Sequence, residues 1–177
     1  PPPGTLPTQQ ELYARYKDDP RVPDRVRAFY SERARAPFPV DLRLVDPGVM
    51  PFRGHKESKE PRQLCWMRAP AELSDEPNLH RCVVAYASDL YLLGTALLPH
   101  GPEVSQRSMQ AASLDHSMWF HKPFRADQWL LYEMESPAAS GARGLTFGHI
   151  YDEKGELVVS VAQEGLIRQR GGGKAKL

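Results

Sequence analysis

Polar groups placed inside apolar stretches are the residues of this chain best suited to chemistry. Asp89 lies within the most apolar segment, residues 79–98, where an ionised carboxylate is costly unless it is paired or hydrogen-bonded. Gln163 lies within the apolar run of residues 157–168, where its amide also needs partners. Together with the hydroxyl of Ser113, these groups can hold and orient a water molecule, with the carboxylate as general base. A structural role stays open for each, because a helix break or neighbouring backbone can also use such groups.

The stretch SLDHSMWFHKPF, residues 113–124, mixes hydroxyl, carboxylate, imidazole and large apolar groups. We predict a central strand, covered on both sides and ended by Pro123, because proline cannot donate to a strand ladder. Side chains alternate faces along a strand. One face is then shared by alternate residues of the stretch: Ser113, Asp115, Ser117, Trp119 and His121. A packed strand whose polar groups are satisfied by neighbours is the alternative to a functional stretch.

Two other kinds of site are disfavoured by the same stretch. His116 and His121 would point to opposite faces of a strand, so the pattern does not predict a metal site. A serine-hydrolase triad is disfavoured because the chain has no G-x-S-x-G motif and His116 would face away from Ser113. The residues predict no cofactor.

Length and charge limit the class of protein. At 177 residues and 20.0 kDa the chain suits one domain with a substantial core and room for an extension. The 23 Lys and Arg against 22 Asp and Glu give a formal net charge of +1, which does not predict binding to nucleic acid. No apolar run reaches the ~20 residues of a membrane span. Cys65 and Cys82 lack metal-ligand spacing, and two cysteines fit a reduced compartment better than a disulfide scaffold.

Residues 1–37 are predicted to form a linker-like arm, since they are rich in proline and charged residues and poor in aliphatic runs. Thr8 and Glu11 fit a capping box that opens a short helix to about residue 18. Residues 24–35 can form a second helix. Both helices are polar on most sides and need a surface to lie against. Residues 171–177, at the other end of the chain, are predicted to be a flexible tail.

The remainder is predicted to be α+β, with one antiparallel sheet wrapped around one long buried helix. Apolar residues at helical spacing predict that helix over residues 79–98, and Pro99 and Gly101 end it. Residues 152–155 fit a turn that joins the last two strands as a hairpin. Strands are expected at residues 40–45, 63–68, 113–123, 128–136, 143–151 and 157–168, and an exposed loop at residues 51–61.

Three separate motifs occur in order along the chain: YASDL at residues 86–90, SLDHSMWFHKPF at residues 113–124 and AQEG at residues 162–165. On these motifs the chain resembles the second half of the acyl-CoA thioesterase II family, and most of all the peroxisomal acyl-CoA thioesterases of animals. The match is clearest from residue 63 to residue 168. The resemblance implies a hotdog fold for residues 38–170, which agrees with the α+β order that the pattern predicts.

The resemblance also implies an activity, the hydrolysis of fatty acyl-CoA thioesters to free fatty acid and CoA without a cofactor. The catalytic aspartate of the family falls on Asp89, its hydroxyl residue on Ser113 and its glutamine on Gln163. These residues are expected to activate a water that attacks the thioester directly. Family members hold two hotdog halves, so this chain is expected to be one half, with a second hotdog half or a homo-oligomer as its partner.

CoA carries phosphates that need basic groups, so substrate binding is expected from the cations that flank the strand ends: Lys122, Arg125 and Arg143. Two other functions remain open. The chain could be an acyl-CoA-binding or assembly module without activity of its own, whose sheet edge pairs with a partner. It could also be a hotdog enoyl-CoA hydratase or dehydratase, for which the buried helix offers Asp89 together with His80.

The last three residues, Ala175, Lys176 and Leu177, resemble the small-basic-leucine address that a peroxisomal import receptor reads. This resemblance predicts a peroxisomal location, with the import receptor as a further partner. A flexible tail without an address is the alternative.

Overall fold

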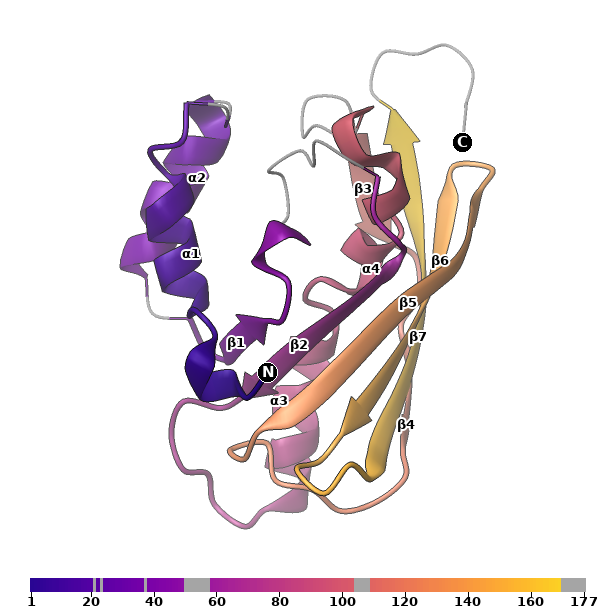
Figure 1. The fold of residues 1–177 in the computed structure, drawn as a ribbon. Coiled ribbons are helices and arrows are strands. Elements are labelled where there is room, and N and C mark those ends of the chain that lie inside the picture. Colours follow the sequence, from indigo (N-terminus) through magenta and orange to yellow (C-terminus); the bar gives the residue numbers. More distant parts are fainter. Residues whose placement is uncertain (21, 23, 37, 50–57, 104–108, 170–177) are drawn as a thin grey trace.

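One antiparallel sheet of seven strands curls around the helices of the described part of the chain (Figure 1). The computed structural model describes residues 1–20, 22, 24–36, 38–49, 58–103 and 109–169. The strand order is β1-β2-β5-β6-β7-β3, and β4 also pairs with β7. The strands are β1 (Asp41–Leu44), β2 (Arg62–Arg68), β3 (Met109–Ser113), β4 (Ser117–Phe120), β5 (Leu130–Ser140), β6 (Arg143–Tyr151) and β7 (Leu157–Gln169).

The long strands follow the alternation that the sequence predicts. Along β6 every second residue from Gly144 to Ile150 is buried, because inward side chains cover the helices and outward ones meet solvent. The predicted hairpin between β6 and β7 is confirmed: the Gly155 N–H donates to the carbonyl of Asp152 at 3.0 Å, with Gly155 at a φ of +78°. The α+β class is also confirmed, and the strand bounds agree within a few residues outside the stretch 113–124.

The prediction of a single helix over residues 79–98 is wrong, whereas the alternative that Asp89 lies at a break in this helix is confirmed. The segment forms α3 (Pro77–Ser88), a break over residues 89–91 and the short helix α4 (Leu92–Thr95). At Tyr91 φ is +70°, a left-handed conformation that cannot continue an α-helix. Hydrophobic spacing alone does not reveal such a break, because residues on both sides of it are buried in the same core.

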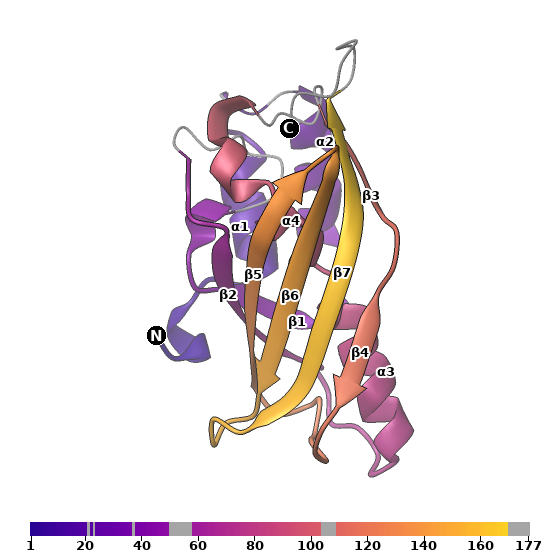
Figure 2. The same ribbon diagram turned by 90° about the vertical axis from the view of Figure 1, so that its right-hand side faces the viewer.

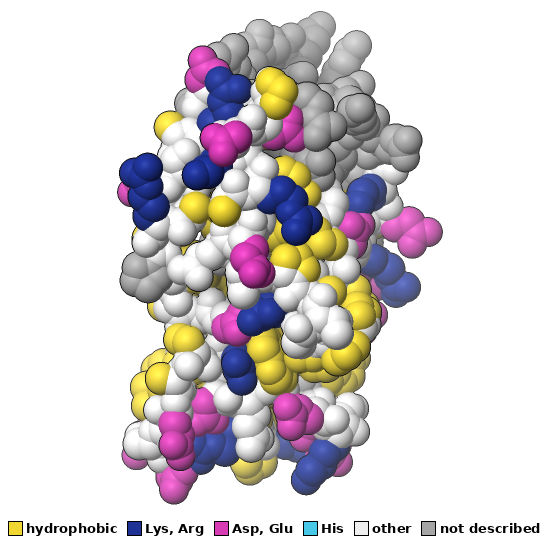
Figure 3. Space-filling view, turned by 60° about the vertical axis from the view of Figure 1, so that its left-hand side comes forward, with side chains coloured by type: hydrophobic (Ala, Val, Ile, Leu, Met, Phe, Trp, Pro, Cys, Tyr) yellow, Lys and Arg dark blue, Asp and Glu magenta, His cyan; other side chains and the backbone are white. Residues whose placement is uncertain are grey.

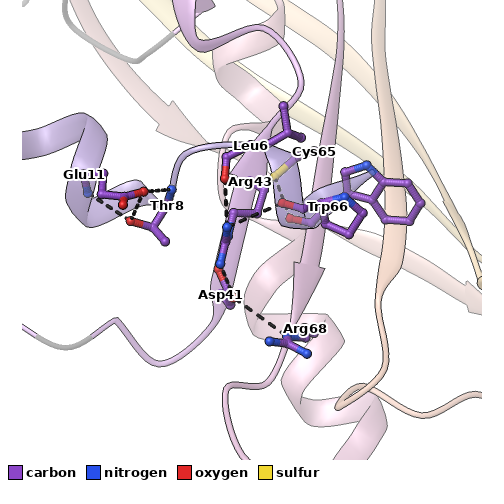
Figure 4. Close-up of polar contacts among 9 residues, drawn as sticks. Leu6, Thr8, Glu11, Asp41, Arg43, Cys65, Trp66 and Arg68 are labelled. Atoms are coloured by element: carbon purple, nitrogen blue, oxygen red, sulfur yellow. Dashed lines mark hydrogen bonds and ion pairs between the residues drawn. The ribbon is translucent and has the colours of Figure 1, made fainter. Parts of the chain in front are cut away.

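The predicted arm contains the helices α1 (Gln9–Tyr16) and α2 (Asp24–Arg35). The capping box is confirmed: the Thr8 hydroxyl accepts from the Glu11 N–H at 3.0 Å, and the Glu11 carboxylate accepts from the Thr8 N–H at 2.7 Å (Figure 4). Side chains of both helices belong to the same apolar core as the sheet: Leu12, Tyr13, Tyr16, Val26 and Tyr30. Short 3-10 turns lie outside these helices: η1 (Pro3–Thr5), η2 (Pro47–Val49) and η3 (Leu98–Glu103).

Polar contacts tie the start of the arm to β1 and β2 (Figure 4). Arg43 on β1 donates to the carbonyl of Leu6 at 2.8 Å, and Asp41 holds the same guanidinium at 2.7 Å. Trp66 on β2 donates from its indole nitrogen to the carbonyl of Pro1 at 3.1 Å. The chain leading into α1 is therefore fixed against the sheet.

Both signs of charge are interspersed over the face shown in Figure 3, as expected for a formal net charge of +1. Cys65 and Cys82 are both free, and burial raises the pKa of the Cys65 thiol to about 12, so that this thiol stays protonated. None of the described helices is long and apolar enough to cross a membrane. The predicted loop at residues 51–61 lies mostly outside the described residues, and the predicted tail at residues 171–177 lies wholly outside them.

Candidate active site

The stretch 113–124 lies at an edge of the sheet, so the prediction of a central strand covered on both sides is wrong (Figure 2). It forms the end of β3 and the separate strand β4, and each pairs only with β7 among the described strands. Its large apolar side chains are open to solvent: the exposed fractions are 55% for Leu114, 52% for Trp119 and 39% for Phe120. The apolar bulk that predicted a buried strand is a surface feature of the described chain.

A β-bulge separates β3 from β4 and changes which side chains face inward. The five-residue step from Ser113 to Met118 lies opposite a four-residue step on β7. One extra residue on one strand reverses the alternation of faces. Ser113 and Met118 consequently both face the helices, whereas strict alternation predicts opposite faces for them. The predicted shared face of Ser113 and Trp119 is wrong for this reason.

Asp115 closes the bulge with its side chain. The N–H groups of Leu114 and Asp115 both donate to the carbonyl of Glu164, at 2.9 and 3.4 Å. Two residues of one strand that lie opposite one residue of its partner are the mark of a β-bulge. The Asp115 carboxylate accepts from the Glu164 N–H at 2.8 Å. That N–H would otherwise lose its ladder partner at the bulge. Asp115 therefore supports the position of Ser113 instead of acting in the site itself.

The structure brings Asp89, Ser113 and Gln163 together, as the sequence predicts. The amide nitrogen of Gln163 donates to Oδ1 of Asp89 at 2.7 Å and to Oγ of Ser113 at 2.8 Å. The Ser113 hydroxyl lies 3.5 Å from the same Oδ1 atom. Asp89 follows the last residue of α3, Ser113 ends β3, and Gln163 lies within β7. Gln163 is fully buried while Asp89 and Ser113 are exposed, so this cluster opens at the surface of the chain.

The hydrogen bonds determine what each polar group can still do. Both amide protons of Gln163 are used, and Oγ of Ser113 accepts one of them. The Ser113 hydroxyl donates its own proton only over a long 3.5 Å contact to Oδ1 of Asp89, which a closer acceptor can replace. Oδ1 of Asp89 accepts the other, and Oδ2 has no partner among the described residues. The amide oxygen of Gln163 is buried without a partner in the described part of the chain. The cluster can therefore offer a carboxylate oxygen and a hydroxyl proton to water or substrate.

The residue that precedes Asp89 is held from two sides. The Tyr132 hydroxyl donates to the carbonyl of Ser88 at 2.9 Å, and Oγ of Ser88 lies 2.9 Å from Nε2 of His116. Burial, with the nearby charge of Asp89, raises the pKa of Tyr132 well above its ordinary value, so the hydroxyl keeps the proton that it donates. Sequence reasoning missed this support. The sequence signal that could have revealed it is Tyr132, a tyrosine at an inward-facing position of an apolar strand, where a buried hydroxyl needs a hydrogen-bond partner.

All three cations predicted to bind CoA form ion pairs with neighbouring carboxylates. Lys122 lies 2.9 Å from a carboxylate oxygen of Glu156. Arg143 lies 3.4 Å from a carboxylate oxygen of Glu164, and the side chain of Glu164 points away from the face that carries Gln163, because neighbours on a strand alternate. Their contribution to CoA binding stays a prediction.

The third predicted cation, Arg125, lies beside the first turn of α3. Its guanidinium donates to Asp127 at 2.8 Å and to Asp75 at 2.5 Å, and the hydrogen bond from Arg125 holds the pKa of the Asp127 carboxyl well below its usual range. An open pocket of about 370 Å³ next to Arg125 contains none of the cluster residues. Binding of CoA by Arg125 also stays a prediction.

His80 does not pair with Asp89 in the way that a hydratase or dehydratase would require. It lies in the first turn of α3, nine residues before Asp89, which corresponds to about 13 Å along a helix. Its Nδ1 accepts from the N–H of Ala126 at 3.0 Å. The histidine therefore supports the loop before β5, and the geometry does not favour that alternative.

Comparison with known proteins gives consistent matches. The family model described as acyl-CoA thioesterase matches residues 34–166. Acyl-coenzyme A thioesterase 8 of Rattus norvegicus is 43% identical over 171 residues, which are 96% of this chain and 52% of that protein. The crystal structure of the acyl-CoA thioesterase II TesB2 from Mycobacterium marinum matches with a TM-score of 0.69 and 38% identity, over 97% of this chain and 55% of that chain. Peroxisomal acyl-coenzyme A thioester hydrolase 1 of Saccharomyces cerevisiae is 30% identical over 103 residues, 56% of this chain and 29% of that protein.

These matches confirm the resemblance that the three motifs predict, and the hotdog fold with it. The chain spans about half the length of the curated relatives that it matches, 52% of the rat protein. It likewise covers 55% of the mycobacterial structure. The site described above therefore lies within one half of such a protein.

Asp115→Ala is expected to loosen the bulge, because the Glu164 N–H loses its acceptor at an exposed edge. Loss of this exposed hydrogen bond should cost about 1 kcal/mol of stability. Amide exchange at Glu164 should therefore speed up several-fold, and the urea midpoint of unfolding should fall slightly. Asp115→Asn is the matched control, since its side-chain oxygen can accept the same bond. Equal exchange at Glu164 in both variants would show that Asp115 does not hold the bulge.

Proposed function

The chain belongs to the acyl-CoA thioesterase family, and on that premise we propose that it hydrolyses fatty acyl-CoA thioesters to free fatty acid and CoA. A water activated by Asp89 attacks the thioester directly, and no acyl-enzyme forms. The observation that carries the proposal is the convergence of Asp89 and Ser113 on the buried amide of Gln163, at 2.7 and 2.8 Å. These residues come from three separate parts of the chain, so only the tertiary fold brings their side chains together.

The carboxylate of Asp89 is suited to act as the general base. Its Oδ1 atom is fixed by Gln163, and its Oδ2 atom has no partner among the described residues. Oδ2 accepts a proton from the water as the water oxygen bonds to the thioester carbonyl carbon. The carbonyl π electrons move to oxygen in this step, which gives a tetrahedral oxyanion.

The hydroxyl of Ser113 is suited to meet that oxyanion. Gln163 donates to Oγ of Ser113, and the hydroxyl proton makes only a long 3.5 Å contact with Oδ1 of Asp89, so it can turn to a developing negative charge on the carbonyl oxygen. When the carbonyl re-forms, the carbon–sulfur bond breaks and the CoA thiolate leaves. A thiol with a pKa of about 8.5 is a good leaving group, and it takes up the proton that Asp89 removed from the water.

Loss of each cluster residue is expected to lower turnover, measured as free-thiol release from acyl-CoAs of several chain lengths. Asp89→Asn removes the base and should reduce kcat by roughly 10² to 10⁴-fold. Ser113→Ala and Gln163→Ala should each reduce kcat by roughly 10 to 10²-fold, because the oxyanion donor or its support is lost. Glu153→Gln, which neutralises an exposed carboxylate in the β6–β7 turn, is the control and should leave kcat unchanged.

Two outcomes of that experiment would contradict the proposal. Full activity in all three variants would remove the assigned roles. Tight acyl-CoA binding without thiol release, in the chain alone and with a second hotdog half, would favour a binding module instead. Each measurement should therefore be made on both preparations.

We further propose that a second hotdog half covers the edge formed by β3 and β4. Large apolar side chains are exposed there and on helix α3, and we call this set the edge patch: Leu79, Tyr86, Leu114, Trp119 and Phe120. Such a group beside an unpaired strand edge is typical of a protein interface. The relatives carry about as much chain again as the part matched here, which is long enough for a second hotdog half. When no second hotdog half is present, a second copy of this chain covers the same edge and forms a homodimer.

Leu114→Lys is expected to shift the chain from dimer to monomer in sedimentation experiments, because a charge would be buried at the interface. Leu64→Lys is the matched control, since Leu64 is an exposed leucine on β2, away from the edge patch, with 37% of its surface accessible. Equal association of both variants, or a wild-type chain that stays monomeric at high concentration, would count against the proposed interface.

We also propose a peroxisomal location, which the name of the yeast relative supports. The candidate address residues lie outside the described part of the chain. A fluorescent protein fused before residue 1 should coincide with a peroxisomal marker in yeast cells, and removal of residues 175–177 should disperse it. A fusion that is diffuse with these residues present would contradict the proposed location.

A further inference from the structure

Tyr91 has an unfavourable backbone conformation close to the proposed base. Its φ of +70° is left-handed, which is uncommon for a bulky residue and costs free energy unless surrounding contacts hold it. Only Leu90 separates it from Asp89, so the path of the chain through Tyr91 sets the direction in which α3 ends. The contacts that hold Tyr91 therefore act on Asp89 as well.

The backbone of Tyr91 is held from the sheet. Gln63, on β2, donates from its amide nitrogen to the carbonyl of Tyr91 at 3.0 Å and to the hydroxyl of Thr95 at 2.6 Å. The Thr95 hydroxyl in turn lies 3.3 Å from the same carbonyl. Tyr91 is the N-cap residue of α4, so side chains from the sheet and from α4 both hold the carbonyl at which that helix begins.

The side chain of Tyr91 is held from the arm. Gln9, the first residue of α1, donates from its amide nitrogen to the Tyr91 hydroxyl, and the hydroxyl is also hydrogen-bonded to Tyr13. Desolvation raises the pKa of Tyr91 well above its ordinary value, so the hydroxyl keeps its proton for these bonds. The arm thus contacts the helix break directly, across 82 residues of sequence.

Gln9 is itself well placed to serve as a fixed support. Its side chain is 6% exposed, and it directly follows Thr8, whose capping box fixes the start of α1 (Figure 4). Arg43 on β1 holds the carbonyl of Leu6, two residues before Thr8, at 2.8 Å. The Tyr91 hydroxyl is therefore bonded to a part of the arm that the sheet keeps in place.

We propose that Tyr91 is a positioning residue for the base, and that the arm, through Gln9 and Tyr13, fixes the helix break so that Asp89 stays in contact with Gln163. The inference rests on the proposed function for its effect on turnover. It assigns the arm a second role besides its part in the core, which is to set the geometry of the site. A shift of about 1 Å in a reacting group can cost as much as 10²-fold in rate, so a modest loosening is measurable.

The test compares Tyr91→Phe, Gln9→Leu and the double variant in the full chain with its second hotdog half. Tyr91→Phe should lower kcat about tenfold with KM within twofold, and should lower the urea midpoint, because the Gln9 amide loses its partner. In the double variant the Gln9 amide is also removed and only the Tyr13 hydroxyl loses its partner, so the midpoint should recover in part while kcat stays low. Tyr151→Phe, which removes a hydroxyl that contacts Glu133 at 3.4 Å, is the matched control with unchanged kcat.

A kcat that recovers together with the urea midpoint in the double variant would overturn the inference, because Tyr91 would then act only through stability. An unchanged kcat in Tyr91→Phe, with Asp89→Asn inactive, would also overturn it and leave the proposed function intact. If the wild-type protein releases no thiol, the proposed function fails, and amide exchange at residues 90–92 decides the inference. Faster amide exchange at these residues in Tyr91→Phe would show that the arm holds the helix break, and unchanged exchange would refute this role.

Discussion

The arrangement of the site depends on one buried amide. Gln163 is fully buried, and each proton of its amide nitrogen needs an acceptor, which Asp89 and Ser113 provide. An acceptor from the helix layer and one from the sheet edge must therefore reach the same nitrogen atom. The helix meets this requirement by ending before Asp89, and the edge meets it by the bulge after Ser113. Both irregularities of the fold follow from this constraint.

Close approach of the helix layer to the sheet has its own requirement, which glycines meet. A Cβ atom on Gly148 would lie 2.4 Å from the ring of Tyr132, the residue that holds the carbonyl before Asp89. A Cβ atom on Gly165 would lie 2.3 Å from Leu93 in α4. Real Cβ contacts are not so short, so a larger residue at position 148 would displace the Tyr132 ring and one at position 165 would displace Leu93 of α4. The short distances in the site thus rest on space left free in β6 and β7.

Local signals account for what could be predicted from the sequence. The capping box at Thr8, the β6–β7 hairpin and the alternating strands are set by neighbours in sequence, and the cluster residues stand out as polar groups in apolar runs. The left-handed Tyr91 and the bulge could not be predicted in this way. Tyr91 is held by residues 28 and 82 positions away, and the bulge by a bond between Asp115 and Glu164, 49 positions apart. The residues at both places fit a regular helix or strand equally well, so only tertiary contacts decide their conformation.

The exposure of the site and that of the edge patch have one origin. Asp89 and Ser113 are exposed although a general base and an oxyanion donor act best where water is largely excluded. Tyr86 lies one helical turn before Asp89, and Leu114 directly follows Ser113, and both are more than half exposed. A surface that covers these two apolar side chains would therefore also restrict solvent around the proposed base. On this argument the proposed second hotdog half and the proposed hydrolytic chemistry are linked, because a contact that buries the edge patch would also enclose the site.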